Sequence, residues 1–374
     1  MKPSILAGLA AASVVWTANA AAGGEPDLGA EAKALAELHV QKLGSGYVTR
    51  IDPKRHLVYV SALDSRTFGR VVQTLARYMD AQRGLLFPDP FLWNVTVVLP
   101  TLADYRKGGP PPDVVGYYRP ATRTLTSISV SNILIHEFTH ALHHSDQVRA
   151  GQRHPVWISE GLATLFQPAR FDDGRMEVPL DGGLAPLQES VRDKTIRTLA
   201  ALCTTDRSQF NREPKTYYPH ARYVMLYLLR QGRLAEFYRT YKSRYAADAT
   251  GEKALEATLG KPLGEIEKAW HGWVLEQEPP WTPAHPIHAH LGVRMERAPE
   301  GVRVDGFLRG SAAEQAGVLK VDDVIISAAG HPTPGPYDLT QAVRSCRPGE
   351  TIDIEIIRGG QTTLVKQVLG GARK

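Results

Sequence analysis

Cysteine is almost absent from this chain: Cys203 and Cys346 are the only two among 374 residues. Two cysteines are too few for a disulfide-stapled scaffold or for a metal site built from thiolates. They lie far apart in the sequence, which leaves open whether they form one bridge between two parts of the chain or remain free thiols. The fold must therefore rest on an ordinary hydrophobic core, for which a content of 43% hydrophobic residues is sufficient.

Long apolar runs and blocks of like charge are missing as well. The formal net charge of +5 is small for this length, and no cluster of lysine and arginine forms a basic helix or patch. This pattern argues against nucleic acid as a partner. No segment after residue 20 has about 20 consecutive apolar residues, so we expect no stable membrane span once a signal peptide has been removed.

The first residues are typical of a secretory signal peptide. Lys2 supplies the positive start, a short apolar run follows, and Ala-Asn-Ala, ending at Ala20, is a small-x-small cleavage site. We predict a signal peptide over residues 1–20 with cleavage near Ala20, and hence a periplasmic or secreted protein. Residues 21–30 (AAGGEPDLGA) are predicted to form a flexible leader.

The order of periodic patterns along the chain predicts an α+β domain followed by a smaller β-rich domain. Strands come first, then a mostly helical stretch from Asn132 to about Glu278, and the Pro- and His-rich residues 279–287 are predicted to be a linker. The predicted early elements are a hairpin of GYVTRID and HLVYVSAL, a helix over Ser65–Arg83, a strand in LWNVTVVLP and a polar-faced strand in GYYRPATRTLTSI.

The densest cluster of titratable residues is ILIHEFTHALHH, which ends at His144. His136 and His140 are four residues apart, so they lie one turn apart on the same face of a helix. Glu137 is rotated by about 100° from His136. It cannot easily join the histidines as a ligand, but it can reach a water on the same cation. This HExxH pattern is typical of a catalytic zinc site in which the carboxylate takes a proton from a metal-bound water.

A catalytic zinc site needs a third protein ligand, and two carboxylates are candidates. Asp146 has the spacing of the HExxHxxGxxH pattern, but that geometry needs a glycine where this chain has His143. Glu160 lies in PVWISEGLATLF, which we predict to be a second helix that begins at its proline. A helix–turn–helix return brings Glu160 back beside the first helix, so we predict that His136, His140 and Glu160 bind the zinc ion.

HEFTH followed by WISEGLA resembles the gluzincin metallopeptidases, especially their aminopeptidase branch, and is similar to secreted bacterial proteins of the peptidase MA-like type. The resemblance covers roughly residues 90–235. It implies a thermolysin-like domain, which we place over residues 31–278. It also implies zinc ligation by His136, His140 and Glu160, with Glu137 as the general base.

TYYPHARYVMLYLL resembles the helix of that branch whose tyrosine hydroxyl stabilises the oxyanion, and Tyr218 is the matching position. His220 and Ala221 stand where the family has Lys-Gly, so Tyr217 and His220 remain alternative donors. No segment resembles the GAMEN motif with which the aminopeptidases hold a substrate N-terminus, and endo- or exopeptidase action stays open. GYYRPATRTLTSI can offer either a structural edge strand or a main-chain partner for an extended peptide.

Three further histidines lie near this site. His143 is one turn past His140 and can hydrogen-bond to a metal-binding side chain. His144 and His154 are predicted to be exposed or capping residues near helix ends.

Near the C-terminus, GSAAEQAGVLKVDDVIISAAG and the predicted helix around Leu339 to Ser345 resemble a bacterial PDZ domain, which we place over residues 288–371. The resemblance implies a peptide-binding groove at Leu291, Gly292 and Val293. There, backbone amides would hold a chain-terminal carboxylate and the following strand would pair with the peptide.

These features predict a periplasmic or secreted zinc peptidase, with Zn²⁺ as cofactor, peptides or proteins as substrates and a PDZ domain that binds C-terminal peptides. Two alternatives stay open. One is a non-catalytic PDZ adaptor on a structural zinc domain, and the other is a zinc amidase that acts on a non-peptide or cell-wall amide. Glu137 argues against the adaptor, because a purely structural zinc site needs no general base.

Overall fold

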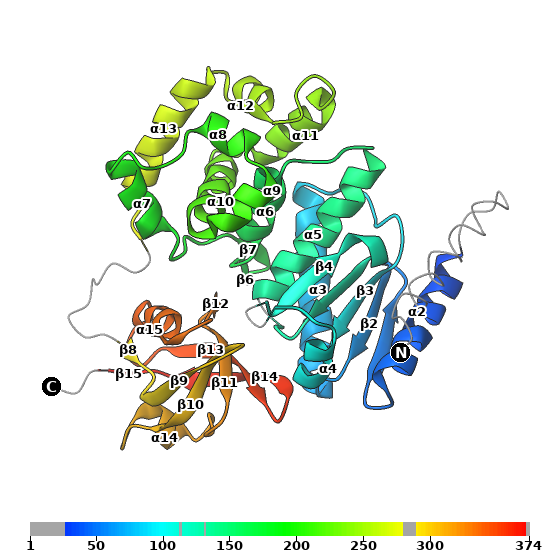
Figure 1. Ribbon diagram of the computed structural model, residues 1–374, viewed down its shortest axis with the longest axis vertical. Helices are drawn as coiled ribbons and strands as arrows, with labels where there is room; N and C mark the ends of the chain where they lie inside the picture. Colours follow the sequence, from blue (N-terminus) through cyan, green and yellow to red (C-terminus); the bar gives the residue numbers. More distant parts are fainter. Residues whose placement is uncertain (1–26, 112–113, 131, 280–288, 372–374) are drawn as a thin grey trace, which may run out of the picture.

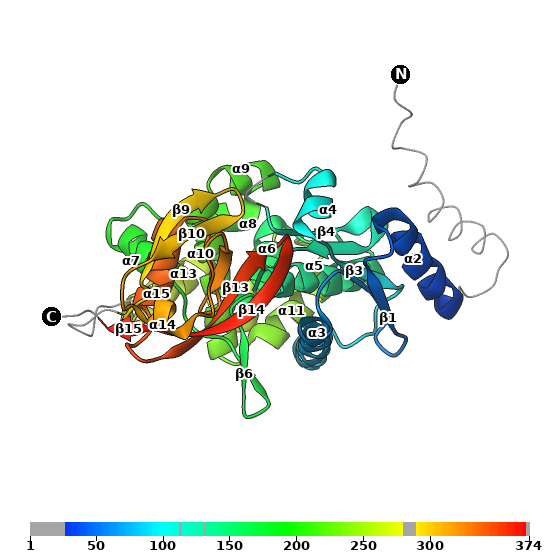
Figure 2. The same ribbon diagram turned by 90° about the horizontal axis from the view of Figure 1, so that it is seen from below.

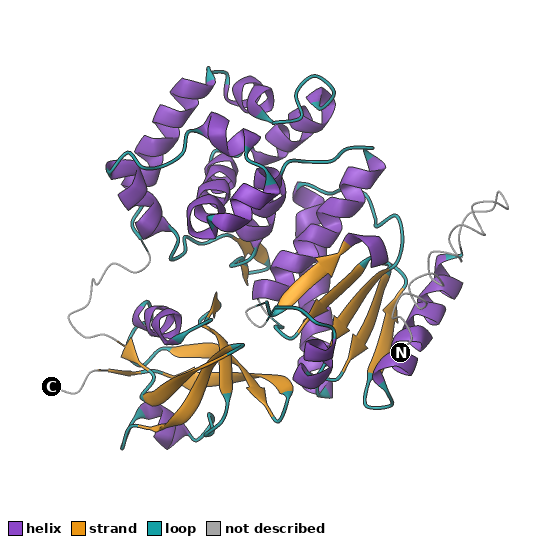
Figure 3. Cartoon of the chain, in the orientation of Figure 1, coloured by secondary structure: helices purple, strands orange, loops and turns teal. Residues whose placement is uncertain are grey.

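The computed structural model describes residues 27–111, 114–130, 132–279 and 289–371. The predicted signal peptide and nearly all of the predicted linker lie outside these ranges. Within them the chain combines helix and sheet, as predicted, and ends in a β-rich domain (Figures 1 and 3). None of the helices in the described ranges is both long and apolar enough to cross a membrane.

A five-stranded sheet forms the first lobe, in the order β1-β2-β3-β5-β4. The predicted hairpin is present as β1 and β2, while β3 runs parallel to both β2 and β5. GYYRPATRTLTSI is two antiparallel strands and not the single strand predicted, because Pro120 opens a 3₁₀ turn between them. The strands are β1 (Val48–Asp52), β2 (Leu57–Ser61), β3 (Val95–Leu99), β4 (Gly116–Arg119) and β5 (Thr124–Ser127).

Strand β2 is buried on both faces of the sheet. Successive side chains of a strand point to opposite faces, so Leu57 and Tyr59 join the core that α3 covers, while Val58 packs with Ala32 and Ala36 of α2. The helices of this lobe are α2 (Leu28–Leu43), α3 (Ser65–Leu85) and α4 (Leu102–Lys107).

Helix α2 begins inside the segment that was predicted to be a flexible leader, residues 21–30. Asp27 accepts hydrogen bonds from the amides of Gly29 and Ala30, which is a standard helix N-cap. Residues 28–30 are therefore the first turn of a helix and not part of a flexible segment, while residues 21–26 lie outside the described residues.

Helices dominate the second lobe, whose core is continuous with that of the sheet (Figure 3). Cys203 is buried in α8, and both Cys203 and Cys346 are free thiols. The elements are α5 (Asn132–Arg149), α6 (Val156–Phe166), β6 (Arg170–Asp172), β7 (Arg175–Glu177), α7 (Leu184–Arg192), α8 (Leu199–Thr204), α9 (Arg207–Arg212), α10 (Pro214–Arg230), α11 (Leu234–Arg244), α12 (Glu252–Leu259) and α13 (Leu263–Glu276).

Gly161 marks a close approach of α6 to α10. A Cβ atom at this position would lie 3.1 Å from both the carbonyl oxygen of Ala221 and Cγ of Met225. A side chain here would force the neighbouring atoms of α10 to move by a few tenths of an ångström, so the glycine favours this close approach. The contact lies one turn from Tyr218, so it helps to set where that tyrosine stands relative to Glu160.

The C-terminal domain is a sheet in the order β14-β13-β11-β10-β9, with β12 paired to β11, around its own hydrophobic core. Figures 1 and 2 both show β14 on the side that faces the first lobe. The elements are β8 (Ala289–His290), β9 (Val293–Ala298), β10 (Gly301–Phe307), α14 (Ala312–Ala316), β11 (Val324–Ala328), β12 (His331–Pro332), α15 (Pro336–Arg344), β13 (Thr351–Arg358), β14 (Gln361–Val368) and β15 (Gly370–Gly371).

Candidate metal centre

His136 and His140 on α5 and Glu160 on α6 converge on one point. The two Nε2 atoms lie 3.1 Å apart, and Oε2 of Glu160 lies 3.4 Å from the Nε2 of His136 and 3.3 Å from that of His140. The helical spacing stacks the two histidines, and the return of the chain into α6 supplies the carboxylate.

This triangle fits a zinc ion. Zinc–nitrogen and zinc–oxygen bonds of about 2.0–2.1 Å at tetrahedral angles place neighbouring ligand atoms about 3.3 Å apart. The three observed separations lie within a few tenths of an ångström of that value. Two imidazoles and one carboxylate are also a common donor set for catalytic zinc, which leaves a coordination position open.

Two neighbouring side chains orient these ligands. Gln167 Oε1 lies 2.9 Å from Nδ1 of His136, so this nitrogen donates to it and Nε2 is left to face the metal position. Arg207 donates from Nη1 to Oε1 of Glu160 at 3.0 Å, which leaves Oε2 toward the histidines. The motif contains neither residue, and the sequence carries no signal for Arg207.

The charges of the triad reinforce one another. Burial alone raises the pKa of Glu160, but the charge of His140 and hydrogen bonds from both histidines outweigh it and hold that pKa well below its usual range. Burial likewise lowers the pKa of His140, yet the Glu160 carboxylate more than compensates and the pKa is raised. A metal ion at this site therefore competes with a proton on the imidazole.

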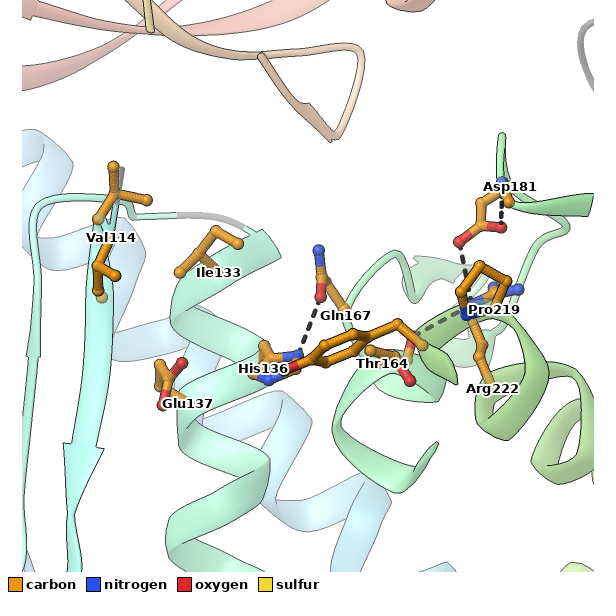
Figure 4. Close-up of a pocket in the computed structure, with 13 residues that line it drawn as sticks. Val114, Ile133, His136, Glu137, Thr164, Gln167, Asp181, Pro219 and Arg222 are labelled. Atoms are coloured by element: carbon orange, nitrogen blue, oxygen red, sulfur yellow. Dashed lines mark hydrogen bonds and ion pairs between the residues drawn. The ribbon is translucent and has the colours of Figure 1, made fainter. Parts of the chain in front are cut away.

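Glu137 points toward strand β4 and away from His136 (Figure 4). Its Oε2 accepts a hydrogen bond of 2.8 Å from the backbone amide of Tyr118. The strand can approach because Gly116 has no side chain: a Cβ there would lie 2.9 Å from Cγ2 of Ile133 on α5. The sequence did not indicate this support for the carboxylate.

Two cavities flank the triad. One of about 430 Å³ reaches His136 and Glu137, and the other, of about 720 Å³, reaches His140 and Glu160. Both follow β4, and among the described strands β4 pairs with β5 alone. The first cavity is lined by Val114, Val115, Gly116, Ile133, His136, Glu137, Thr164, Gln167, Asp181, Gly183, Tyr218, Pro219 and Arg222 (Figure 4).

The structure separates the three candidate oxyanion donors. Tyr218 lines the first cavity with His136 and Glu137. Burial, and then the charge of Glu160, raise its pKa, so the hydroxyl keeps its proton at neutral pH. Tyr217 is 1% exposed and stacks on Phe210, while His220 is 0% exposed and stacks on Trp270. Both alternatives therefore point into the core.

The surrounding histidines differ from expectation. His154 is 6% exposed, and its Nδ1 lies 2.7 Å from Nε2 of the buried His143. His144 is half-buried, with Nδ1 3.0 Å from the hydroxyl of Tyr118. The prediction that His144 and His154 are exposed or capping residues is wrong, because aromatic side chains of distant segments cover the end of α5.

Asp146 takes no part in the triad. Its carboxylate accepts a hydrogen bond of 2.6 Å from the Tyr238 hydroxyl and ion-pairs with Lys242 at 2.8 Å. Both partners come from α11, so Asp146 joins α5 to α11 within the second lobe.

In the C-terminal domain, Leu291 and Val293 are buried and Gly292 has a φ of +79°, a conformation that favours glycine. The Gly292 carbonyl accepts hydrogen bonds from the Leu308 amide and the Ser311 hydroxyl. This loop leads into β9, at the edge of the described sheet, with α15 beside it. The predicted groove residues thus stand where an added strand could pair.

Residues 289–367 match the PDZ domain family, which confirms the predicted PDZ domain. No curated protein matches the chain. An HtrA-type protease solved with a decapeptide is 21% identical over 30% of this chain and 36% of its own, with a TM-score of 0.22. The chain thus spans little more than a third of that protein.

Two further solved structures are similar at lower identity. An aminopeptidase N family protein from Idiomarina loihiensis is 13% identical, with 87% of this chain and 66% of that chain covered and a TM-score of 0.38. The PDZ domain of a carboxy-terminal protease from Vibrio cholerae, in complex with peptide, is 12% identical over 24% of this chain and 99% of its own, with a TM-score of 0.21. At these values the likenesses carry no argument about activity, and the gluzincin resemblance stays a prediction.

Proposed function

We propose that the protein is a zinc-dependent peptidase. The observation that carries this proposal is the triangle of His136, His140 and Glu160, with ligand atoms 3.1–3.4 Å apart and Glu137 beside it, between two cavities along an edge strand. A structural zinc site needs neither a general base nor an open cleft.

When bound by the triad, zinc would supply Lewis-acid polarisation of a carbonyl and would lower the pKa of a water. Glu137, held by the Tyr118 amide, takes a proton from the attacking water and returns it to the leaving amine. The Tyr218 hydroxyl donates a hydrogen bond to the oxygen on which negative charge develops.

The substrate in this proposal is an extended peptide. Strand β4 has a free edge among the described strands, and both cavities follow it, so a peptide can pair with β4 while its side chains enter the cavities on either side of the triad. The PDZ groove at Leu291–Val293 binds a second chain, the C-terminus of a peptide or protein. We further propose that the protein works in the periplasm or outside the cell, as its N-terminal sequence predicts.

The test is cleavage profiling of a mixed peptide library by mass spectrometry, with the wild type and Glu137→Gln side by side. Zinc content of both proteins is measured by elemental analysis. We expect stoichiometric zinc in both and cleavage only by the wild type. Stoichiometric zinc without cleavage by either protein would contradict the proposal and favour the PDZ adaptor, and activity confined to non-peptide amides would favour the amidase.

A further inference from the structure

The PDZ domain is joined to the first lobe by buried polar contacts. Glu355 of β13 is 1% exposed; its carboxylate accepts hydrogen bonds from the backbone amide of Val130 and, at 3.1 Å, from the hydroxyl of Ser129. The Thr362 hydroxyl donates to the carbonyl of Ile128. These contacts fall on the segment that leads into α5, the helix with both metal-binding histidines.

Apolar side chains complete this interface. Ile326 and Ile357 of the PDZ domain form one buried cluster with Tyr105 and Ile128 of the first lobe. Tyr117 of strand β4 packs against the same cluster. Separation of the domains would expose this apolar cluster to water, which is unfavourable, and would break the hydrogen bonds of Glu355. The two domains therefore act as one body beside the cleft.

The β11–β12 turn of the PDZ domain lies beside Asn132, the residue before Ile133 in the lining of the first cavity. Ala328 pairs with His331, and the two residues between them, Ala329 and Gly330, have φ of +49° and +79°. A two-residue turn with two positive φ values is the tight type I′ geometry. A Cβ atom on Gly330 would lie 3.6 Å from Nδ2 of Asn132, the first residue of α5.

His331, on the far side of this turn, is half-buried. Burial lowers its pKa, and the charges of Asp181 and Arg222 act on it as well, raising and lowering the pKa respectively. Asp181 and Arg222 line the first cavity and form an ion pair of 3.1 Å. The turn thus lies beside the start of α5, and Figure 4 shows this pale orange hairpin above the cavity that Asp181 and Arg222 line.

We propose that the PDZ domain is a fixed wall of the substrate cleft, and that its β11–β12 turn limits how far a bound peptide can extend beyond the first cavity. This inference rests on the proposed peptidase function and names its substrate class: short peptides, or chains whose free end lies a few residues from the cleaved bond. Glu355 is a positioning residue, because it holds the wall in place without touching substrate.

The test uses full-length protein and one cleaved peptide that is lengthened residue by residue at either end. Two variants weaken the wall. Glu355→Gln weakens the hydrogen bonds between the PDZ domain and the first lobe, and His331→Ala removes the imidazole next to the β11–β12 turn. The matched control is Asp353→Asn, the same chemical change two residues away on β13, where the carboxylate is exposed and pairs with Lys366 at 2.8 Å.

We expect the wild type and Asp353→Asn to cleave the short peptides and to lose activity as one end is lengthened. Glu355→Gln and His331→Ala should raise kcat/KM for the lengthened peptides about tenfold, the scale of one relieved steric contact in a specificity pocket. Activity on the shortest peptide should stay unchanged. Hydrogen–deuterium exchange at residues 127–135 should become faster in Glu355→Gln and not in Asp353→Asn, which reports on the docking independently of catalysis.

Equal cleavage of long and short peptides by the wild type would overturn this inference and leave the peptidase function intact. Faster exchange in Glu355→Gln with an unchanged length limit would also overturn it. Cleavage of no peptide by the wild type would overturn the proposed function and this inference together.

Discussion

Single side chains around the triad divide into those that face the cleft and those that face the core, often at adjacent positions. Tyr217 and Tyr218 are the clearest pair. Both belong to the first turns of α10, yet Tyr217 stacks on Phe210 inside the core and Tyr218 lines the cavity with Glu137. Neighbouring residues on a helix point about 100° apart, so two chemically identical side chains can have unrelated roles.

This pair gives a matched test of the oxyanion donor. We expect Tyr218→Phe to lower kcat about 100- to 1,000-fold, the usual effect of losing one such donor, with bound zinc unchanged. Tyr217→Phe should retain wild-type kcat, since its ring packing is preserved. Steady-state kinetics on a peptide found in the library measures both variants. Equal losses in the two variants would show that the tyrosines act through packing alone.

At the scale of elements, the geometry of the triad depends on how closely α6 approaches α10. Gly161→Ala would place a methyl group 3.1 Å from the Ala221 carbonyl oxygen, and overpacking of this kind costs about 1–3 kcal/mol. Gly69 in α3 has open space around it, so Gly69→Ala should stabilise the protein by up to about 1 kcal/mol, through helix propensity alone.

Chemical denaturation of the two alanine variants measures this contrast in the free energy of unfolding. Zinc affinity should fall with Gly161→Ala, because Glu160 precedes the displaced residue, and should not change with Gly69→Ala. A Gly161→Ala protein as stable as Gly69→Ala would mean that the helices can separate without cost.

Some features of these elements could be predicted from the sequence, and others could not. His136, His140 and Glu160 lie on two helices joined by a short return. Helical spacing was enough to pair the histidines, while Glu160 was placed beside them by the predicted return of the chain and by the family resemblance. The strands β4 and β5 were missed as a pair because their side-chain pattern continues through Pro120, and only the chain reversal distinguishes a hairpin from one long strand. Arg207 and Gln167 could not be found, since each reaches the triad through tertiary packing.

At the scale of the whole molecule, the packing of the PDZ domain against the first lobe could not be predicted from the sequence. A PDZ domain is recognisable from its own motifs, but Glu355 and Val130 are 225 residues apart and neither belongs to a motif. The same holds for His143 and His154, whose burial depends on tyrosines from α11. Such contacts form only in the folded protein, and they produce no periodic pattern in the sequence.

Buried neutral histidines make the stability of the whole molecule depend on pH. Burial lowers the pKa of His154 and of His220 to about 3, and that of His143 well below its usual range. In the unfolded chain each takes up a proton near pH 6.5. The stabilisation is therefore complete above pH 6.5 and is lost progressively as the pH falls from 6.5 toward the folded pKa, because the unfolded state then binds more protons.

His220→Phe isolates one of these groups. Among the described residues, neither ring nitrogen of His220 has a hydrogen-bond partner, and phenylalanine keeps the stacking on Trp270. We expect the variant to lose less stability on acidification, by up to about 1.4 kcal/mol per pH unit below pH 6.5. Unfolding followed over this pH range in excess chelator, which removes metal release as a cause, measures the difference. Parallel curves for the variant and the wild type would contradict the assignment.

The carboxylate of Glu137 is held by a main-chain N–H group, that of Tyr118. Every amino acid except proline carries this donor, so a scan that replaces side chains one at a time will leave this bond in place and will not measure its contribution. The effect of a side-chain change at position 118 therefore says nothing about the value of the main-chain N–H group to the site. Only a change to the backbone, by proline or by an amide-to-ester replacement, would make the contribution visible.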